Sequence, residues 1–204
     1  HVRKYGFHGT SHRFVSMKYG EVTGKSLEGL NIVSCHLGNG SSITAIKDGK
    51  SVDTSMGFTP LDGIIMGTRS GSVDPSAVEF VQNKLGFTPA QMSDYLNKKS
   101  GFLGLSGQFS DNRDITSAAQ QGDKRSQLVT DMLTYEIKKY IGSYTAAMNG
   151  LDVVIFTGGI GENAPEVRKG VCENMEYLGI KLDSSVNDGL KGKLTKISAP
   201  DSKV

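Results

Sequence analysis

The sequence predicts an α/β domain with a mixed sheet, in which an antiparallel meander is combined with parallel strands and flanking helices. Residues 31–55 hold three β-rich runs separated by short turns. Residues 124–148 have apolar residues at helical spacing, and residues 151–156 form an apolar run typical of a strand buried on both faces. The chain of 204 residues shows no repeat or linker, so one domain is expected.

The first half of the chain is expected to supply one short helix and the meander. Residues 11–19 are assigned to a helix with Ser11 as its cap. Strands are expected at residues 31–37, 41–47 and 50–55, reversed at Gly38-Asn39-Gly40 and at Asp48-Gly49. Residues 57–74 contain four glycines and are expected to form a long loop.

The second half is expected to be mainly helical. Pro75 and Pro89 suit the first turns of two helices, because proline has no N–H to lose there. The predicted helices cover residues 75–84, 89–99, 114–121, 124–148 and 164–178, with loops at 100–112 and 157–163. One or two weak strands are expected between residues 180 and 199.

Composition and charge exclude several classes of protein. The net charge is +2 and no block of like charge occurs, which argues against a basic nucleic-acid module. Cys35 and Cys172 lie far apart without a CxxC pair, so we expect neither a disulfide framework nor a zinc site. This cysteine usage favours a reducing, cytoplasmic location. No apolar run approaches the roughly 18 residues of a membrane helix. The chain starts at His1 without a signal-peptide pattern, and we expect it to begin inside a longer protein.

Glycine makes up 26 of the 204 residues, about twice its usual share. Such an excess indicates turns, left-handed backbone or close approach of backbone to a ligand. Gly159 to Ala164 fits the pattern G-x-G-x-x-A after a predicted buried strand, a context that suits nucleotide contact. The small residues of the Gly38-Asn39-Gly40 turn leave N–H groups free to cradle a phosphate, although taken alone this segment reads more simply as a type I′ turn. The Gly24-Lys25-Ser26 segment lacks the spacing and preceding strand of a P-loop.

Three other positions carry side chains suited to catalysis or anion binding. Arg69 stands between Gly67 and Gly71 in a long loop, which suits an anion clamp. His8 and His12 are four residues apart but lack the glutamate of a zinc-protease helix, so zinc is not expected. Each of these residues also has a plain structural reading, as a solvated loop arginine or a core histidine.

Taken together, five segments in order resemble the acetate kinase family, or acetokinases. They are Tyr5-Gly-Phe-His-Gly-Thr-Ser-His12, His36-Leu-Gly-Asn-Gly-Ser-Ser42, Asp53-Thr-Ser-Met-Gly-Phe-Thr-Pro60, Met66-Gly-Thr-Arg-Ser-Gly71 and Thr157-Gly-Gly-Ile-Gly-Glu-Asn163. The resemblance implies the two-domain sugar kinase/Hsp70/actin architecture. Residues 1–204 would be the C-terminal nucleotide-binding domain, a ribonuclease H-like, actin-like ATPase domain.

The resemblance also assigns roles to individual residues. His8 and Arg69 correspond to catalytic residues, Arg69 also to a holder of the carboxylate or phosphoryl group, and both are expected to supply positive charge. Phe7 and Pro60 match a small apolar pocket for the acetate methyl, and His12 is a supporting candidate. The positions that correspond to nucleotide-binding residues are His36, Gly38, Asn39, Gly40, Asp111, Arg113, Gly159, Ile160 and Asn163. Asp111 and Arg113 read equally well as a cluster at a helix N-terminus.

The implied activity is reversible, Mg²⁺-dependent phosphoryl transfer between ATP and acetate, giving acetyl phosphate and ADP, by a homodimer. In-line transfer of this kind relies on positive charge and N–H donors around the phosphoryl oxygens. The family's catalytic acid and its phosphate and Mg²⁺ contacts lie on a domain that this sequence lacks. We therefore assign no metal ligand here and expect the chain alone to bind nucleotide without turnover.

Three alternatives remain open at this point. A propionate kinase of the same family would differ only in its acyl pocket. A non-catalytic actin-like nucleotide-binding module would have no reason to aim Arg69 and His8 at a carboxyl substrate. A Rossmann-type NAD binder would require further βαβ units, which the meander disfavours.

Overall fold

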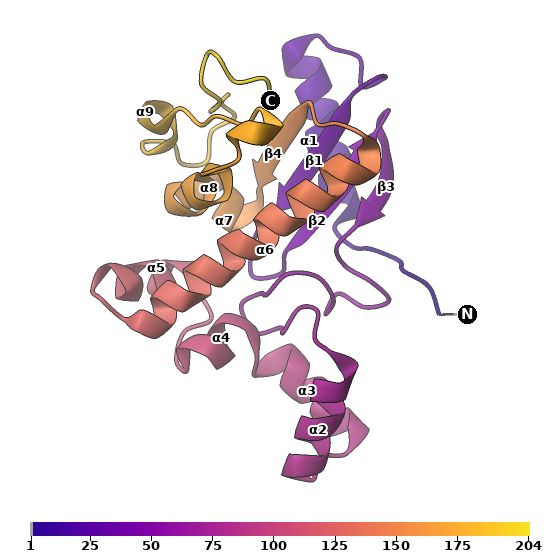
Figure 1. The fold of residues 1–204 in the computed structure, drawn as a ribbon, viewed down its shortest axis with the longest axis vertical. Helices are drawn as coiled ribbons and strands as arrows, with labels where there is room; N and C mark the ends of the chain where they lie inside the picture. The colour runs from indigo at the N-terminus through magenta and orange to yellow at the C-terminus, as the bar shows by residue number, and fades with distance from the viewer. Residues whose placement is uncertain (1) are drawn as a thin grey trace.

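The computed structural model describes residues 2–204 and confirms the α/β class, with a mixed sheet and flanking helices (Figure 1). The sheet contains β1 (Asn31–His36), β2 (Ser42–Lys47), β3 (Lys50–Thr54) and β4 (Val153–Thr157), in the order β3-β2-β1-β4. The first three strands pair antiparallel as a meander, and β4 lies parallel to β1. A sheet with one parallel pair is not the doubly wound sheet of a dinucleotide-binding fold.

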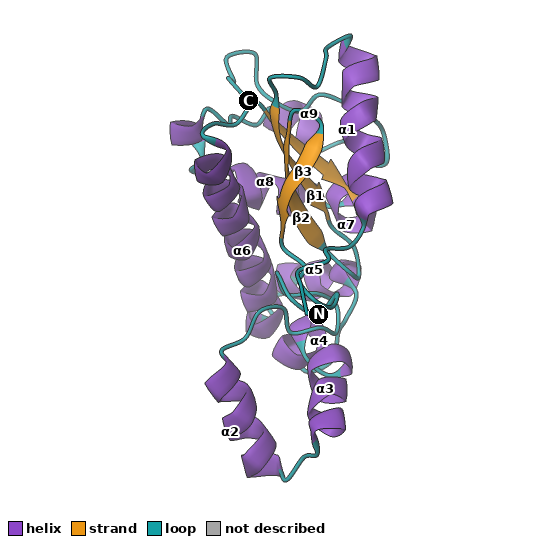
Figure 2. Cartoon of the chain, turned by 90° about the vertical axis from the view of Figure 1, so that its right-hand side faces the viewer, coloured by secondary structure: helices purple, strands orange, loops and turns teal. Residues whose placement is uncertain are grey.

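The sheet lies between two helices (Figure 2). Helix α6 (Lys124–Met148) covers one face and α1 (Gly9–Thr23) covers the other. Buried residues follow each other at intervals of four along α6, from Val129 through Leu133 and Ile137 to Ile141. They pack in one cluster with Val33 and other residues of β1 and β2, so the predicted periodic face is the face that forms the core.

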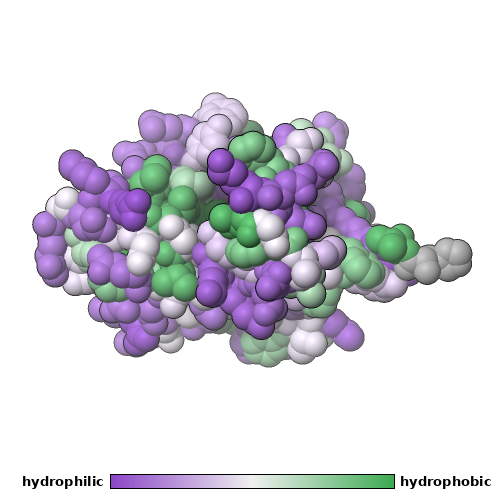
Figure 3. All heavy atoms as spheres, turned by 90° about the horizontal axis from the view of Figure 1, so that it is seen from below, coloured by the Kyte–Doolittle hydropathy of each residue, from purple (hydrophilic) through white to green (hydrophobic). Residues whose placement is uncertain are grey.

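The remaining helices lie at one end of this layer structure and along its β4 side (Figure 1). They are α2 (Pro75–Leu85), α3 (Pro89–Lys98), α4 (Gly101–Ser106), α5 (Asn112–Gln120), α7 (Gly158–Asn163), α8 (Pro165–Cys172), the 3-10 helix η1 (Glu176–Leu178) and α9 (Ser184–Asn187). Those from α7 to α9 lie along the β4 side, and those from α2 to α5 lie at the end. Helices α2 and α3 project as a hairpin, and α2 buries no residue. Seen from that end, hydrophobic and hydrophilic side chains are interspersed rather than gathered in one patch (Figure 3).

Local chemistry explains the elements that were predicted most closely. The helix expected at 124–148 has these bounds, capped by Asp123, whose carboxylate accepts from the Ser126 N–H at 2.9 Å. Asp48 and Gly49 both have positive φ, 52° and 73°, as a tight hairpin between twisted strands requires. The long loop at 57–74 contains no helix or strand.

Three predictions about helices were wrong. Helix α1 begins at Gly9 rather than residue 11, so Ser11 is inside the helix and does not cap it. The segments expected to be loops at 100–112 and 157–163 contain α4 and α7. Both are short and rich in glycine, and both are held by tertiary contacts: Phe102 and Ile160 belong to the core.

The predictions for the last quarter of the chain also need correction. Strand β4 pairs only with β1 within residues 2–204, and four of its five residues are half-buried, so it is not buried on both faces. The helix expected at 164–178 breaks after Cys172, where Asn174 adopts a φ of 58°. Between residues 180 and 199 the only strand pairing described is a bridge from Leu182 to Ser198. Both cysteines are free and buried.

Candidate active site

Two loops meet where the parallel strands β1 and β4 end. His36 is paired with Thr157, and the next residue, Leu37, donates its N–H to the Thr157 carbonyl at 2.8 Å. The Leu37 carbonyl then accepts the N–H of Ile160 at 2.8 Å. These bonds hold the glycine loop at 38–41 beside the start of α7. The carboxyl ends of adjacent parallel strands are a common place for ligands in α/β proteins.

Of the glycines in these loops, Gly158 has a left-handed backbone with a φ of 79°, whereas Gly38, Gly40 and Gly159 do not. Gly38 and Gly40 have no positive φ, so the type I′ turn is not what forms here. Instead, a β-carbon at Gly40 would lie 3.2 Å from Arg69 Nη1. Gly159 is exposed, has no positive φ, and has no atom within 4 Å of the position that its β-carbon would take. Neither backbone conformation nor packing within the chain requires glycine at 159, which leaves room for a ligand.

The loop at 57–74 brings Arg69 against the first glycine loop. Arg69 is half-buried, and its Nη1 donates to the Pro60 carbonyl at 3.2 Å. Gly67 donates its N–H to the Asn39 carbonyl at 3.2 Å, and a β-carbon at Gly67 would lie 2.0 Å from Asn39 Oδ1. No carboxylate forms an ion pair with Arg69 within residues 2–204. The guanidinium therefore keeps most of its hydrogen-bonding capacity for something outside the described chain.

Three histidines lie together beside this loop. His8 occupies the N-cap of α1 with a φ of 59° and stacks on His36, with ring centroids 4.1 Å apart. His8 Nδ1 is 2.9 Å from Ser42 Oγ, and His36 Nδ1 is 2.8 Å from Ser11 Oγ. His12 is buried one turn further along α1 and bonds both Ser34 and Ser42. The resemblance to acetokinases thus singled out residues that the fold brings into one cluster.

All three histidines are held in the neutral form. Burial lowers the pKa of His12 to about 4, with further contributions from His36 and His8. Burial also lowers the pKa of His8, helped by the neighbouring His36 and Arg69. Burial lowers the pKa of His36 against the opposing effect of Glu162. The lowered pKa favours the neutral form of His8, which then acts as an N–H donor; a positive charge on His8 in the presence of substrate stays a prediction.

Asp111 and Arg113 lie at the start of α5 and bind each other. The Asp111 carboxylate accepts from Arg113 Nη2 at 2.6 Å and from Nε at 3.0 Å, and it caps the helix through the Arg113 N–H. Arg113 lowers the pKa of Asp111 through these hydrogen bonds. The preceding Ser110 carbonyl lies 2.8 Å from the β-carbon position of Gly67. This helix start therefore lies beside the region between the loops at 38–41 and 57–74 and the start of α7, which we call the cleft. The pair is a helix N-terminal cluster, and its contact with nucleotide stays a prediction.

The other predicted residues lie around the same loops. The Ile160 side chain belongs to the core, and its N–H donates to the Leu37 carbonyl, so its contact with nucleotide stays a prediction. Asn163 is exposed and donates to the Gly159 carbonyl at 3.0 Å. Phe7 is 37% exposed next to His8, and Pro60 lies beside Arg69. A pocket for a methyl group between Phe7 and Pro60 stays a prediction.

Sequence reasoning missed four polar residues around the histidines. They are Ser11, Ser34, Ser42 and Glu162. Ser34 and Ser42 are fully buried in strands among apolar neighbours, and a serine at such a position was the available signal. Glu162 accepts hydrogen bonds from the Thr157 hydroxyl at 3.1 Å and the Gly158 N–H at 3.3 Å. It therefore places a carboxylate near His36.

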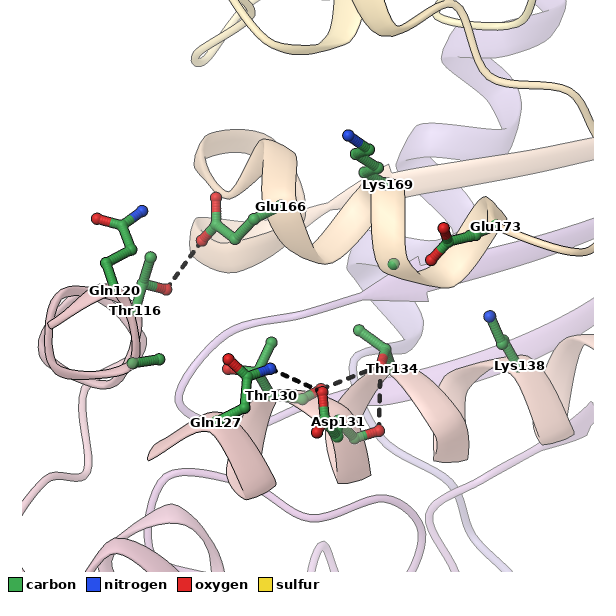
Figure 4. Close-up of a pocket in the computed structure, with 12 residues that line it drawn as sticks. Thr116, Gln120, Gln127, Thr130, Asp131, Thr134, Lys138, Glu166, Lys169 and Glu173 are labelled. Carbon is green, nitrogen blue, oxygen red and sulfur yellow. Dashed lines mark hydrogen bonds between the residues drawn. The ribbon is translucent and has the colours of Figure 1, made fainter. Parts of the chain in front are cut away.

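A separate surface groove of about 400 Å³ lies between α5, α6 and α8 (Figure 4). Charges of both signs line it, among them Asp131, Lys138, Glu166 and Lys169. It shares no residue with the cleft. Over residues 2–204 no helix combines the length and apolar character needed to cross a membrane. Nor does any set of three or more His, Cys, Asp or Glu side chains in that range converge as a metal site would require.

The whole chain resembles proteins of one family. The model of the acetokinase family matches residues 1–204. Acetate kinase of Carboxydothermus hydrogenoformans is 56% identical over 203 residues, covering 100% of this chain and 50% of the relative, and that of Thermotoga maritima is 55% identical over 205 residues, covering 100% and 51%. The chain thus spans about half the length of these curated relatives.

Solved structures agree with the sequence relatives. The crystal structure of Porphyromonas gingivalis acetate kinase matches with a TM-score of 0.97 and 51% identity, covering 100% of this chain and 51% of that one. A propionate kinase from Francisella tularensis matches with a TM-score of 0.91 and 41% identity, covering 99% and 51%. The fold is the actin-like ATPase fold of these enzymes. The chain belongs to the acetokinase family.

Proposed function

We propose that this chain is the C-terminal nucleotide-binding half of an acetate kinase, which transfers a phosphoryl group between ATP and acetate. The observation that carries the proposal is the convergence of Arg69 and His8 beside two glycine loops at the ends of β1 and β4. Membership of the acetokinase family supports the same reading.

The arrangement suits stabilisation of a phosphoryl group in transit. The Arg69 guanidinium, with one backbone carbonyl as its oxygen partner, offers a cation and free N–H donors to phosphoryl or carboxylate oxygens. His8 adds a neutral donor, and Asn39 and Gly40 add backbone N–H groups, since the Gly38 N–H donates to Ser41 Oγ at 3.1 Å. Such donors act on the charge spread over the equatorial oxygens during in-line transfer. Asp111, Arg113 and the Gly159–Asn163 segment are assigned to the adenosine side.

Magnesium enters the proposal as the partner of ATP. Mg²⁺ commonly keeps its waters and binds through one or two carboxylates together with substrate phosphates. Because no group of three metal-ligating side chains converges within residues 2–204, we assign no residue of this chain to the ion.

Binding and turnover are tested separately. We expect calorimetry of the 204-residue chain to show binding of MgATP and none of NAD⁺; a preference for NAD⁺ contradicts the proposal. A coupled assay with acetate and MgATP is then run beside the Thermotoga maritima acetate kinase. We expect no turnover by the chain alone, and turnover comparable to the full-length enzyme contradicts the assignment of half a site.

Propionate is the second candidate substrate, because a propionate kinase shares this fold at 41% identity. The acyl pocket beside Phe7 and Pro60 would decide between the two acids. In a longer protein that contains this chain, the ratio of kcat/KM for acetate and propionate measures the preference directly. We assign acetate because the curated relatives with 54–56% identity carry that name.

We further propose a homodimer in the cytoplasm. The free, buried cysteines suit a reducing compartment. Sedimentation at tens of micromolar, the range of a weak interface, measures the assembly. A monomer alone at that concentration contradicts the dimer.

A further inference from the structure

Two buried serines connect His12 to His8 through a chain of hydrogen bonds. Ser34 Oγ lies 2.9 Å from His12 Nδ1. His12 Nε2 lies 2.7 Å from Ser42 Oγ, which lies 2.9 Å from His8 Nδ1. Ser34 and Ser42 are fully buried and His12 is 3% exposed. The chain runs from the middle of β1, through α1 and the first residue of β2, to the histidine at the cleft.

Burial of Ser34 fixes the direction in which this chain donates. Its hydroxyl has one hydrogen, and within residues 2–204 its hydrogen-bond partner is His12 Nδ1. A buried O–H group without an acceptor is more costly than an unused lone pair, since buried donors in proteins are almost always paired. Ser34 therefore donates its hydrogen to His12 Nδ1.

The remaining hydrogens follow from this first one. His12 is neutral at pH 7, because its pKa is about 4, and a neutral imidazole carries one N–H. Since Nδ1 accepts, Nε2 holds the hydrogen and donates it to Ser42. The hydrogen of Ser42 then points to His8 Nδ1. A neutral His8 must carry its own hydrogen on Nε2, the nitrogen that bonds no side chain or backbone group described here.

We propose that Ser34, His12 and Ser42 are positioning residues, which fix His8 as the tautomer whose Nε2–H is presented to a substrate oxygen. The identity of that oxygen, as part of a transferred phosphoryl group, rests on the proposed function. The assignment of the His8 tautomer does not depend on the proposed function. If the hydrogen bonds ran in the opposite direction, His8 would carry its hydrogen on Nδ1. Its Nε2 would then have no hydrogen and would act as a base rather than as a donor. Partners of this kind commonly set the tautomer of functional histidines.

The charged groups around His8 act in the same sense. His36 stacks on it from β1, Arg69 approaches from the loop at 57–74, and His12 lies beside it on α1. Of these, His36 and Arg69 lower the pKa of His8 and so disfavour a positive charge on it. Protonation of His8 would also set an Nδ1–H against the hydrogen of Ser42. Loss of the Ser42 hydroxyl should therefore raise the pKa of His8.

The tautomers are measured directly in the unsubstituted protein. The chain contains four histidines, at positions 1, 8, 12 and 36, so long-range ¹H–¹⁵N imidazole spectra of the labelled 204-residue chain are simple to assign. At pH 7 and without nucleotide, we expect the Nε2–H tautomer for both His8 and His12. An Nδ1–H tautomer at either residue overturns the proposal. No substrate is present, so this result is independent of any phosphoryl transfer assay.

Substitutions test whether the relay itself sets the state of His8. We expect Ser42→Ala to raise the pKa of His8 in an NMR titration, whereas Ser42→Thr retains a hydroxyl and the low pKa. Ser16→Ala is the matched control, because Ser16 is a buried serine of α1 that bonds the Arg13 carbonyl and no histidine. An unchanged His8 pKa in folded Ser42→Ala overturns the proposal. If Ser42→Ala does not fold, the tautomers of the unsubstituted chain decide the question alone.

Discussion

Two arginines of this molecule use the same side chain in opposite ways. Arg168 on α8 is 2% exposed, and all five of its N–H groups bond protein oxygens. The acceptors are Asn187 Oδ1 and the carbonyls of Gly161, Glu162, Asn187 and Leu190, at 2.8–3.1 Å. Arg69 in the cleft is half-buried and donates to one carbonyl oxygen, that of Pro60.

The number of N–H donors left unused distinguishes a structural arginine, Arg168, from a candidate ligand-binding arginine, Arg69. Arg168 joins the end of α7 to α9 and to the chain beyond it, and it has no donor left for a ligand. Arg69 has donors left, and so does His8, which lies close enough for the arginine to lower its pKa. Buried polar groups that are fully paired stabilise a fold, whereas those with unused donors at a cleft point to a bound partner.

The largest effect is expected when the fully paired arginine is removed. Arg168→Met removes five hydrogen bonds from a buried site, so we expect a loss of about 3 kcal/mol or more in the free energy of unfolding. Arg69→Met is the matched comparison and should cost about 1 kcal/mol, the net value of one hydrogen bond. Urea denaturation measures both. Equal losses of unfolding free energy in the two variants would contradict the distinction between a structural Arg168 and a ligand-binding Arg69.

The next effect concerns the cost of keeping the cleft histidines neutral. The pKa of His12 is about 4 in the folded chain and 6.5 as an ordinary value, so the unfolded chain binds more protons between these pH values. The free energy of unfolding should therefore fall by about 3 kcal/mol as the pH drops from 7 to 4, through His12 alone. His8 and His36 add to the loss in the same direction. Arg168 stays charged throughout, so its contribution does not vary.

His12→Gln isolates this contribution. Glutamine does not titrate, so the variant should lose less stability between pH 7 and pH 4 than the unsubstituted chain, whatever its stability at pH 7. The comparison is made by urea denaturation across the pH range. Parallel pH profiles for the two proteins would show that His12 is not held neutral by the fold.

Sequence reasoning reached as far as local chemistry determines structure. The helix at 124–148 and the Asp48-Gly49 turn depend on spacing and backbone preference within a few residues, and both were predicted closely. Helices α4 and α7 were missed because their glycine-rich sequences have poor helix propensity and depend on burial of Phe102 and Ile160. Their stability comes from parts of the chain that are distant in sequence.

The same limit applies to the site. Resemblance to a family pointed to His8, His36 and Arg69, and the fold brings these together. The serines that bond the histidines lie 22 to 34 positions away from them in the sequence, so no local pattern identifies the pairs. Arg168 was not singled out either, because its five acceptors come from α7, α9 and the segment after it.

A glycine substitution separates fold from function more finely. Gly159→Ala places a methyl group in open space within α7, so the free energy of unfolding should stay equal or rise by up to about 1 kcal/mol. If the Gly159 backbone approaches nucleotide, the same methyl group lowers MgATP affinity at least about tenfold, or about 1.4 kcal/mol. Calorimetry measures the affinity.

Gly142→Ala is the control for this prediction. Gly142 lies within α6, also with no atom within 4 Å of its β-carbon position, and away from the cleft. The Gly142→Ala variant should gain the same helix stability, and its affinity for MgATP should be unchanged. An unaltered affinity in Gly159→Ala would instead mean that the open space at 159 is not used by nucleotide.

The smallest effect on stability is expected at Arg113, which lies between the two extremes of the comparison. Its guanidinium is paired, as that of Arg168 is, but its side chain is 90% exposed and its partner is the neighbouring Asp111. Solvent screens such a pair, so Arg113→Ala should leave the urea midpoint unchanged. MgATP affinity should nevertheless fall, because the exposed guanidinium lies at the start of α5, where the adenosine side of the cleft is assigned. Unchanged affinity together with unchanged stability would remove Arg113 from the site and restrict the nucleotide contacts to the two glycine loops.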